Sequence, residues 1–270
     1  MEIPQFKNKA DLIDFLVENK EIMIQNKKSI LHKSDAISFA PARINDKGDT
    51  IKAESVGMLL DANALKVDLV INTTNLMDSH RDVHFRGIWT KSLKEQKNLY
   101  LLQEHKMEFA TIISDQVKAS ARIMDWSDIG YSFEGKTQAL IFKATIEKER
   151  NPFMFDQYAK GYVKNHSVGM RYVKIALATS DERYPEELTI WNKYFDQIAN
   201  KEEAEQIGYF WAVTEAKIIE GSAVPMGSNF ATPTLNVEAK QDNEPTKVTQ
   251  PESSEDTQKN GSKGSQFLFY

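Results

Sequence analysis

Short apolar runs separated by turn-forming residues are the feature that most constrains the fold of this chain. Between residues 38 and 76 such runs alternate with Asn, Asp, Gly and Thr, and the clearest is VDLVI at 67–71. Runs of this length that end at turn residues are typical of strands. Residues 116–124 and 138–146 show the same texture, with a glycine-containing hairpin connection expected between them. The sequence therefore predicts a core rich in β-structure.

Apolar residues at helical spacing occupy other parts of the chain. Residues 8–30 predict one amphipathic helix, and a second is expected over 89–99. A third begins at Asn151-Pro152, because Asn can cap free amides and Pro suits the first helical position. A further set of apolar residues at helical spacing predicts a helical insertion near 180–208. Together with the strands, these segments predict an α+β fold.

Composition excludes several classes of function. The chain has 34 Lys and Arg residues against 39 Asp and Glu residues, so no broad positive field favours nucleic acid. It has no cysteine, which removes disulfides, thiolate zinc sites and cysteine nucleophiles. No apolar run approaches the roughly 20 residues that span a bilayer, and the first ten residues lack the apolar core of a signal peptide. We expect a soluble protein with neither a nucleic acid nor a membrane partner.

Ser167, in the stretch NHSVGM at 165–170, is the candidate nucleophile. A serine becomes a useful nucleophile when a base removes its proton and a third group orients that base. His166 is adjacent but would point to the opposite face of a strand. His105 is the better candidate for the base, because it follows a short apolar run and lies in a polar stretch. A surface histidine is the alternative interpretation of His105.

Two carboxylates are candidates for the third position. Glu215 and Glu220 both lie in the stretch at 214–222, and Glu220 ends an apolar strand pattern. A carboxylate there would either form a surface salt bridge or hold the imidazole in the correct tautomer. Gly169 allows close approach of the backbone, and nearby backbone N–H groups are plausible donors to an oxyanion.

The stretch DSHRDVH at 78–84 is a rival site that resembles a metal centre. Asp78, His80, Asp82 and His84 would all face one way in a strand. Successive side chains on that face lie about 6.6 Å apart, so three of them cannot share one zinc ion without a sharp bend. Two of these side chains together with His105 could bind one zinc ion. A polar turn or sheet edge is the alternative.

The order of these motifs resembles the HK97-type family of phage prohead maturation proteases, which is related to the herpesvirus assemblins. The resemblance spans roughly residues 67–234. It rests on the polar Asp-rich turn, Gly and helix of 78–93, on His105 after Leu101-Leu102-Gln103-Glu104, on Tyr158-Ala159-Lys160-Gly161 leading to Ser167-Val168-Gly169-Met170, and on Glu220-Gly221-Ser222-Ala223-Val224-Pro225 with Asn229.

The resemblance implies His105 as general base, Ser167 as nucleophile and Glu220 as the third member of the triad. Glu215 stays open as the alternative third member. It implies an assemblin-like fold, in which a β-barrel-like core of mostly antiparallel strands is surrounded by helices. It implies a serine endopeptidase that needs no cofactor or metal. Its substrates would be the major capsid protein, the scaffold and itself, cleaved during bacteriophage procapsid maturation in the host bacterial cytoplasm, with self-association inside the procapsid. Lys106, where the family often has Asp, and a long connection over 174–210 depart from the family pattern.

The expected division of the chain is an N-terminal helix over 1–36, a protease domain over 37–235 with the insertion near 180–208, and a disordered tail over 236–270. After Thr234 the sequence is almost entirely polar until the final FLFY. Such a segment can bury too little apolar surface to offset the conformational entropy that it would lose on ordering. The tail would be a self-cleavage region or a scaffold-binding arm. Two other functions stay open: a non-enzymatic capsid scaffolding protein, and a metal-dependent hydrolase that uses residues 78–84.

Overall fold

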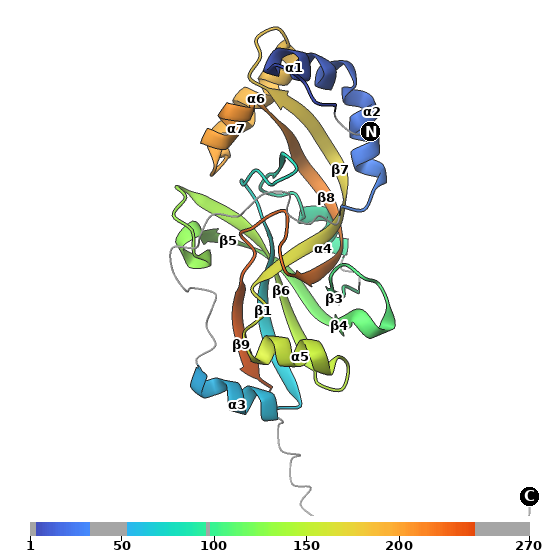
Figure 1. Cartoon of the computed structure of the whole chain (residues 1–270), viewed down its shortest axis with the longest axis vertical. Helices are drawn as coiled ribbons and strands as arrows, with labels where there is room; N and C mark the ends of the chain where they lie inside the picture. Colours follow the sequence, from blue (N-terminus) through green and yellow to red (C-terminus); the bar gives the residue numbers. More distant parts are fainter. Residues whose placement is uncertain (1–3, 33–52, 96–97, 241–270) are drawn as a thin grey trace, which may run out of the picture. The chain divides into compact units, whose positions relative to one another are not determined.

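The computed structural model describes residues 4–32, 53–95 and 98–240 (Figure 1). Its strands are β1 (Ala64–Thr73), β2 (Asp82–His84), β3 (Leu101–Gln103), β4 (Ile112–Ser114), β5 (Gln116–Asp125), β6 (Lys136–Glu147), β7 (Asn165–Thr179), β8 (Tyr209–Val224) and β9 (Thr234–Ala239). Its α-helices are α1 (Lys9–Glu18), α2 (Lys20–Ser29), α3 (Ala53–Asp61), α4 (Thr90–Glu95), α5 (Pro152–Ala159), α6 (Pro185–Tyr194) and α7 (Lys201–Ile207). Single 3-10 turns cover Phe109–Thr111, Trp126–Ile129 and Phe195–Gln197. The prediction of an α+β fold is confirmed.

The strands form two sheets, and within the described ranges they close no barrel. The first sheet has four strands in the order β5-β6-β1-β9, and all its neighbours are antiparallel. In the second sheet, of five strands, β8 runs antiparallel to β7 and parallel to both β2 and β3. β7 and β8 are the longest strands and run side by side (Figure 1). Where a barrel-like core was expected, β5 and β9 instead remain as edges of the first sheet.

The two sheets approach each other closely at Gly221 of β8. A Cβ atom at this position would lie 2.6 Å from Cε2 of Phe142 and 3.2 Å from Cδ1 of Ile71. Because side chains alternate along a strand, Glu220 and Ser222 on either side of Gly221 point away from Phe142. The core therefore fixes which face of β8 carries these two polar side chains.

The N-terminal segment forms two helices, α1 and α2, where one helix was predicted over 8–30. The break falls at Asn19, whose side-chain amide donates a hydrogen bond to the carbonyl oxygen of Phe15 at 2.8 Å. Such a local bond competes with the helical ladder. After α2, His32 exchanges two backbone hydrogen bonds with Met170 of β7, at 2.8 Å and 3.2 Å. The segment is thus joined to the strand that carries Ser167.

Two other predictions are wrong. Residues 53–61 form helix α3 instead of a strand, and α3 packs on α5 and buries Leu59. Residues 236–239, predicted to begin a disordered tail, continue β9, because pairing with β1 supplies backbone hydrogen bonds that composition does not reveal. The predictions for 33–52 and for 241–270 lie outside the described residues.

Several predicted elements are found where the sequence placed them. β5 and β6 form the expected antiparallel pair over the two apolar runs. Asn151 caps α5, since its side-chain oxygen accepts a hydrogen bond from the Met154 amide at 3.1 Å. The segment near 180–208 contains α6, the turn Phe195–Gln197 and α7, and it connects β7 to β8.

Candidate functional site

His105 lies two residues after β3, in a turn that places its ring beside β8. The backbone φ angles of Glu104 and His105 are 52° and 58°, and the Lys106 amide donates to the carbonyl oxygen of Gln103 at 3.0 Å. Positive φ at two successive central positions is the geometry of a type I′ turn, which ordinarily selects Asn and Gly. Neither residue is one of these, so the turn is held by its surroundings. Backbone strain of this kind is concentrated at functional sites.

Glu220 of β8 is the direct partner of the His105 ring. Its Oε1 atom lies 2.6 Å from Nδ1 of His105, and the carboxylate is fully buried, with 0 % of its surface exposed. An ionised carboxylate only accepts hydrogen bonds, so Nδ1–H donates and Nε2 is left as the basic nitrogen. This is the tautomer that a general base needs when it faces a nucleophile.

Ser222 connects the same carboxylate to the backbone of His105. Its hydroxyl donates to Oε2 of Glu220 at 2.7 Å and accepts a hydrogen bond from the His105 amide at 3.1 Å. Ser222 is 0 % exposed. Ser222 stands in the motif at 220–225, but no role was predicted for it from the sequence. The position two residues after Glu220, on the same strand face, is the signal that could have identified it.

Ser167 lies opposite Ser222 in the antiparallel pair of β7 and β8. Directly opposed residues share a sheet face, with Cβ atoms about 4.5–5.5 Å apart. The register therefore puts Ser167 on the face that carries Glu220 and Ser222, and His105 bonds to both of these residues. Three elements far apart in sequence thus meet here, since Glu220 contacts His105 and Ser167 lies on the same face of the β7–β8 pair.

The side chains of the predicted base and nucleophile are mostly covered. His105 is 8 % exposed and Ser167 is 7 % exposed. Gly227 lies against Ser167, because a Cβ atom there would be 3.6 Å from Cβ of Ser167 and only 2.8 Å from the carbonyl oxygen of His166. The chain after β8 therefore covers the start of β7.

His166 belongs to the opposite face, as the sequence analysis expected. Its ring is buried between Tyr158, whose hydroxyl lies 3.0 Å from Nε2, and the carbonyl oxygen of Thr232, which lies 3.1 Å from Nδ1. The Thr232 hydroxyl also donates to the carbonyl oxygen of His166 at 2.7 Å. His166 therefore ties β7 to the chain after β8 and does not serve Ser167.

Glu215, the alternative third member, lies at a different place on β8. It pairs in register with Lys174, and its carboxylate bonds to Nζ of Lys174 at 3.0 Å and to Nζ of Lys91 at 2.9 Å. The hydrogen bond from Lys91 and then that from Lys174 lower the pKa of Glu215. The histidine ring is bonded to Glu220, so the structure places Glu220 and not Glu215 beside His105.

Two residues of the rival metal site, Asp82 and His84, are engaged in a separate buried network. Asp82 accepts hydrogen bonds from Nζ of Lys27 and from the hydroxyl of Tyr172, the latter at 2.8 Å. The Tyr172 hydroxyl also lies 3.1 Å from Nε2 of His84, while Nδ1 of His84 is 3.0 Å from Oδ1 of Asn72. Among the residues that the structure describes, no group of three or more His, Cys, Asp or Glu is placed to hold a metal ion.

Burial controls the ionisation of this network. Burial, followed by the charge of Asp82, raises the pKa of Asp78 to about 7. Burial likewise lowers the pKa of His84 to about 4. Burial opposes ionisation of Asp82 as well, but the charge and hydrogen bond of Lys27 outweigh it and lower the pKa of Asp82. Lys27 therefore keeps one carboxylate ionised in the interior.

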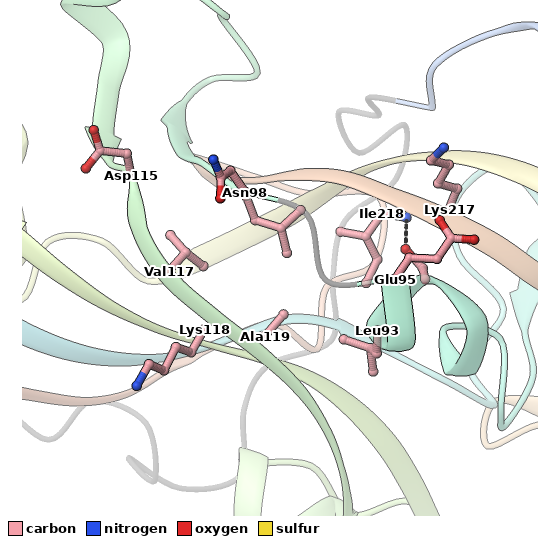
Figure 2. Close-up of a pocket in the computed structure, with 11 residues that line it drawn as sticks. Leu93, Glu95, Asn98, Asp115, Val117, Lys118, Ala119, Lys217 and Ile218 are labelled. Atoms are coloured by element: carbon pink, nitrogen blue, oxygen red, sulfur yellow. Dashed lines mark hydrogen bonds between the residues drawn. The ribbon is translucent and has the colours of Figure 1, made fainter.

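A pocket of about 450 Å³ lies between α4, β5 and β8 (Figure 2). Its lining residues are Ser92, Leu93, Glu95, Asn98, Leu99, Asp115, Val117, Lys118, Ala119, Lys217 and Ile218. Ser92 accepts a hydrogen bond from the Ile218 amide at 2.9 Å in one wall. His105, Ser167 and Glu220 are not among the lining residues, so the pocket is distinct from the cluster around His105.

Comparison with known proteins found no match to any family model, to any curated protein or to any solved structure. No helix in the described part of the chain is long and apolar enough to cross a membrane.

Proposed function

We propose that this chain is a serine endopeptidase in which Ser167 is the nucleophile, His105 the general base and Glu220 the residue that orients it. The observation that carries the proposal is the 2.6 Å contact between His105 Nδ1 and the buried Glu220 carboxylate, with Ser167 on the neighbouring strand. A buried carboxylate on one nitrogen of a histidine fixes its tautomer and stabilises the imidazolium that forms during attack.

The proposed reaction proceeds in two halves. Ser167 Oγ attacks the scissile carbonyl carbon while its proton passes to Nε2 of His105. The imidazolium is stabilised by Glu220 and gives this proton to the departing amine, so the C–N bond breaks and an acyl-enzyme remains. Water then attacks the ester with His105 again as base, which releases the acid and restores Ser167. The reaction requires no cofactor.

The proposed biological role is that of a phage prohead maturation protease of the HK97 type, with an assemblin-like fold. It is supported by the order of the motifs over residues 67–234 and by the contacts that their polar members make. The substrates would be the major capsid protein, the scaffold and the chain itself. Cleavage would occur inside the assembling procapsid, in the host bacterial cytoplasm, during virion assembly.

The test is co-expression with a phage major capsid protein as the proposed substrate, followed by mass spectrometry of the products. Ser167→Ala should abolish every defined cleavage. Ser120→Ala, at an exposed serine of β5, is the matched control and should leave cleavage unchanged. A fluorophosphonate probe, which labels activated serines, should mark the wild type and Ser120→Ala but not Ser167→Ala.

The alternative functions predict different results. A non-enzymatic scaffolding protein would give identical products from the wild type and Ser167→Ala. A metal-dependent hydrolase would lose activity on addition of a chelator, whereas the serine mechanism predicts that cleavage is insensitive to it.

A further inference from the structure

We infer that Ser222 is a positioning residue that fixes both the backbone and the side-chain partner of His105, a role that rests on the proposed serine protease function. Its single hydroxyl makes two contacts of opposite kind. It accepts from the amide of His105 at 3.1 Å and donates to Oε2 of Glu220 at 2.7 Å. Because Ser222 bonds to both the His105 backbone and the Glu220 carboxylate, a displacement of its hydroxyl would shift both groups.

The hydrogen bonds of the Glu220 carboxylate show why the donor matters. Oε1 faces Nδ1 of His105 at 2.6 Å and Oε2 faces Ser222. With one oxygen bonded to a fixed strand residue, rotation of the carboxylate is restricted and Oε1 stays aimed at the ring. Without that bond, Oε2 would be a buried charged acceptor that lacks its donor, and the carboxylate would turn to recover one.

The turn at His105 gives a second reason. The φ angles of Glu104 and His105 are 52° and 58°. Residues other than glycine and asparagine seldom adopt this backbone region. Two bonds to β8 oppose relaxation of this turn. One joins the Glu104 amide to the carbonyl oxygen of Ala223 at 3.0 Å, and the other is the bond from the His105 amide to Ser222.

Two serines face each other across β7 and β8, and their surroundings separate their roles. Ser222 is 0 % exposed and its hydroxyl proton is directed to Glu220, so it lacks both access to a substrate and a free path to the base. Ser167, its cross-strand partner on the same face, is 7 % exposed. The pair therefore divides into one nucleophile and one positioning residue.

The test compares Ser222→Ala with Ser222→Thr, which restores a hydroxyl, and with Ser114→Ala as a matched control. Ser114 is also buried, but its hydroxyl donates to the carbonyl oxygen of Thr145, away from the cluster around His105. Ser222→Ala should lower kcat on the order of 10²-fold with KM changed by less than about 3-fold, because it misplaces catalytic groups without touching the substrate. Ser222→Thr should recover most of the rate, and Ser114→Ala should keep it.

A second measurement does not depend on turnover. Proton–nitrogen NMR of the protein labelled at its five histidines reports the tautomer of each ring, with His105→Asn used to assign its signals. The His105 Nδ1–H signal should be sharp and downfield in the wild type and in Ser222→Thr, and broadened or lost in Ser222→Ala. This comparison remains informative if the wild type cleaves nothing, which would contradict the proposed function alone.

The positioning role is overturned if Ser222→Ala, folded as judged by its circular dichroism, retains both the wild-type kcat and the wild-type His105 signal. It is equally overturned if Ser114→Ala changes both readouts as much as Ser222→Ala does. Should Ser222→Ala not fold, Ser222→Thr decides: a folded threonine variant that loses the His105 signal contradicts the proposal.

Discussion

The carboxylate of Glu220 occupies the space that a side chain at position 169 would fill. A Cβ atom built on Gly169 would lie 2.0 Å from Oε1 of Glu220 and 2.7 Å from its carboxyl carbon. Gly169 and Glu220 are cross-strand partners in β7 and β8. The glycine therefore allows the carboxylate to lie flat over β7 and reach His105. From the sequence, Gly169 was expected to allow close approach of the backbone, whereas in the structure the Glu220 side chain is what approaches it.

Gly169→Ala should consequently lower the proposed protease activity without removing any reacting group. The new methyl group would push Oε1 away from His105, and we expect capsid cleavage to fall by about 10²-fold or more. Gly57→Ala in α3 is the matched control, because no atom lies within 4 Å of its Cβ position. It should leave cleavage intact and change the free energy of unfolding by less than about 1 kcal/mol. Equal activity in the two variants would contradict the packing argument.

Two carboxylates on one strand provide a direct test of the third member of the proposed triad. Glu220→Gln should reduce kcat by about 10⁴-fold, since an amide favours the wrong imidazole tautomer and cannot stabilise the imidazolium. Glu215→Gln should keep the rate, because this carboxylate bonds to Lys91 and Lys174 at the surface. Single-turnover cleavage of a capsid-derived peptide measures both. A loss of rate confined to Glu215→Gln would reverse the assignment.

Local chemistry explains which elements could be predicted from the sequence. The apolar run at 67–71 lies within β1, and the cap at Asn151 begins α5, because each depends on a few neighbouring residues. The break at Asn19 was missed, since an asparagine side chain can either face solvent or bond to the helix, and the sequence does not show which. β9 was missed because its partner β1 is far away in sequence.

The candidate site shows the same division. His105, Ser167 and Glu220 could be nominated from residue type and position in a motif. Their arrangement depends on the register of β8 against β3 and β7, which pairs Ser222 with Leu102 on one side and with Ser167 on the other. No local pattern specifies that register. The roles of Ser222 and Gly169 follow from it, and so they emerge only from the structure.

The Lys27–Asp82 ion pair is expected to be important for stability. The side chains of Lys27 and Asp82 are 18 % and 2 % exposed, and removal of one partner of a buried pair leaves an uncompensated charge. Lys27→Met should lower the free energy of unfolding by about 3–5 kcal/mol when measured in urea at pH 8, where Asp82 is ionised. Lys136→Met, which breaks an exposed pair with Asp125, should cost at most about 1 kcal/mol. Similar losses in both variants would refute this prediction.

His84 and Asp78 should give the stability opposite dependences on pH. The folded pKa of His84 is about 4, below its unfolded value of about 6.5. Between these values the unfolded chain takes up a proton that the folded chain does not, so stability falls as pH falls through this window. The folded pKa of Asp78 is about 7, above its unfolded value of about 3.9. Here the folded chain binds the extra proton, so acid adds stability.

Substitution separates these two contributions. When the pH falls from 7 to 4.5, the free energy of unfolding should decrease less for His84→Gln than for the wild type, because the buried imidazole that resists protonation is gone. The difference between the two decreases should be on the order of 2–3 kcal/mol. Asp78→Asn keeps the side-chain oxygen that accepts hydrogen bonds from the amides of His80 and Asp82. Over the same pH range its free energy of unfolding should decrease more than that of the wild type. Urea denaturation at the two pH values measures both differences. Shifts of the same sign in the two variants would show that burial does not control these ionisations.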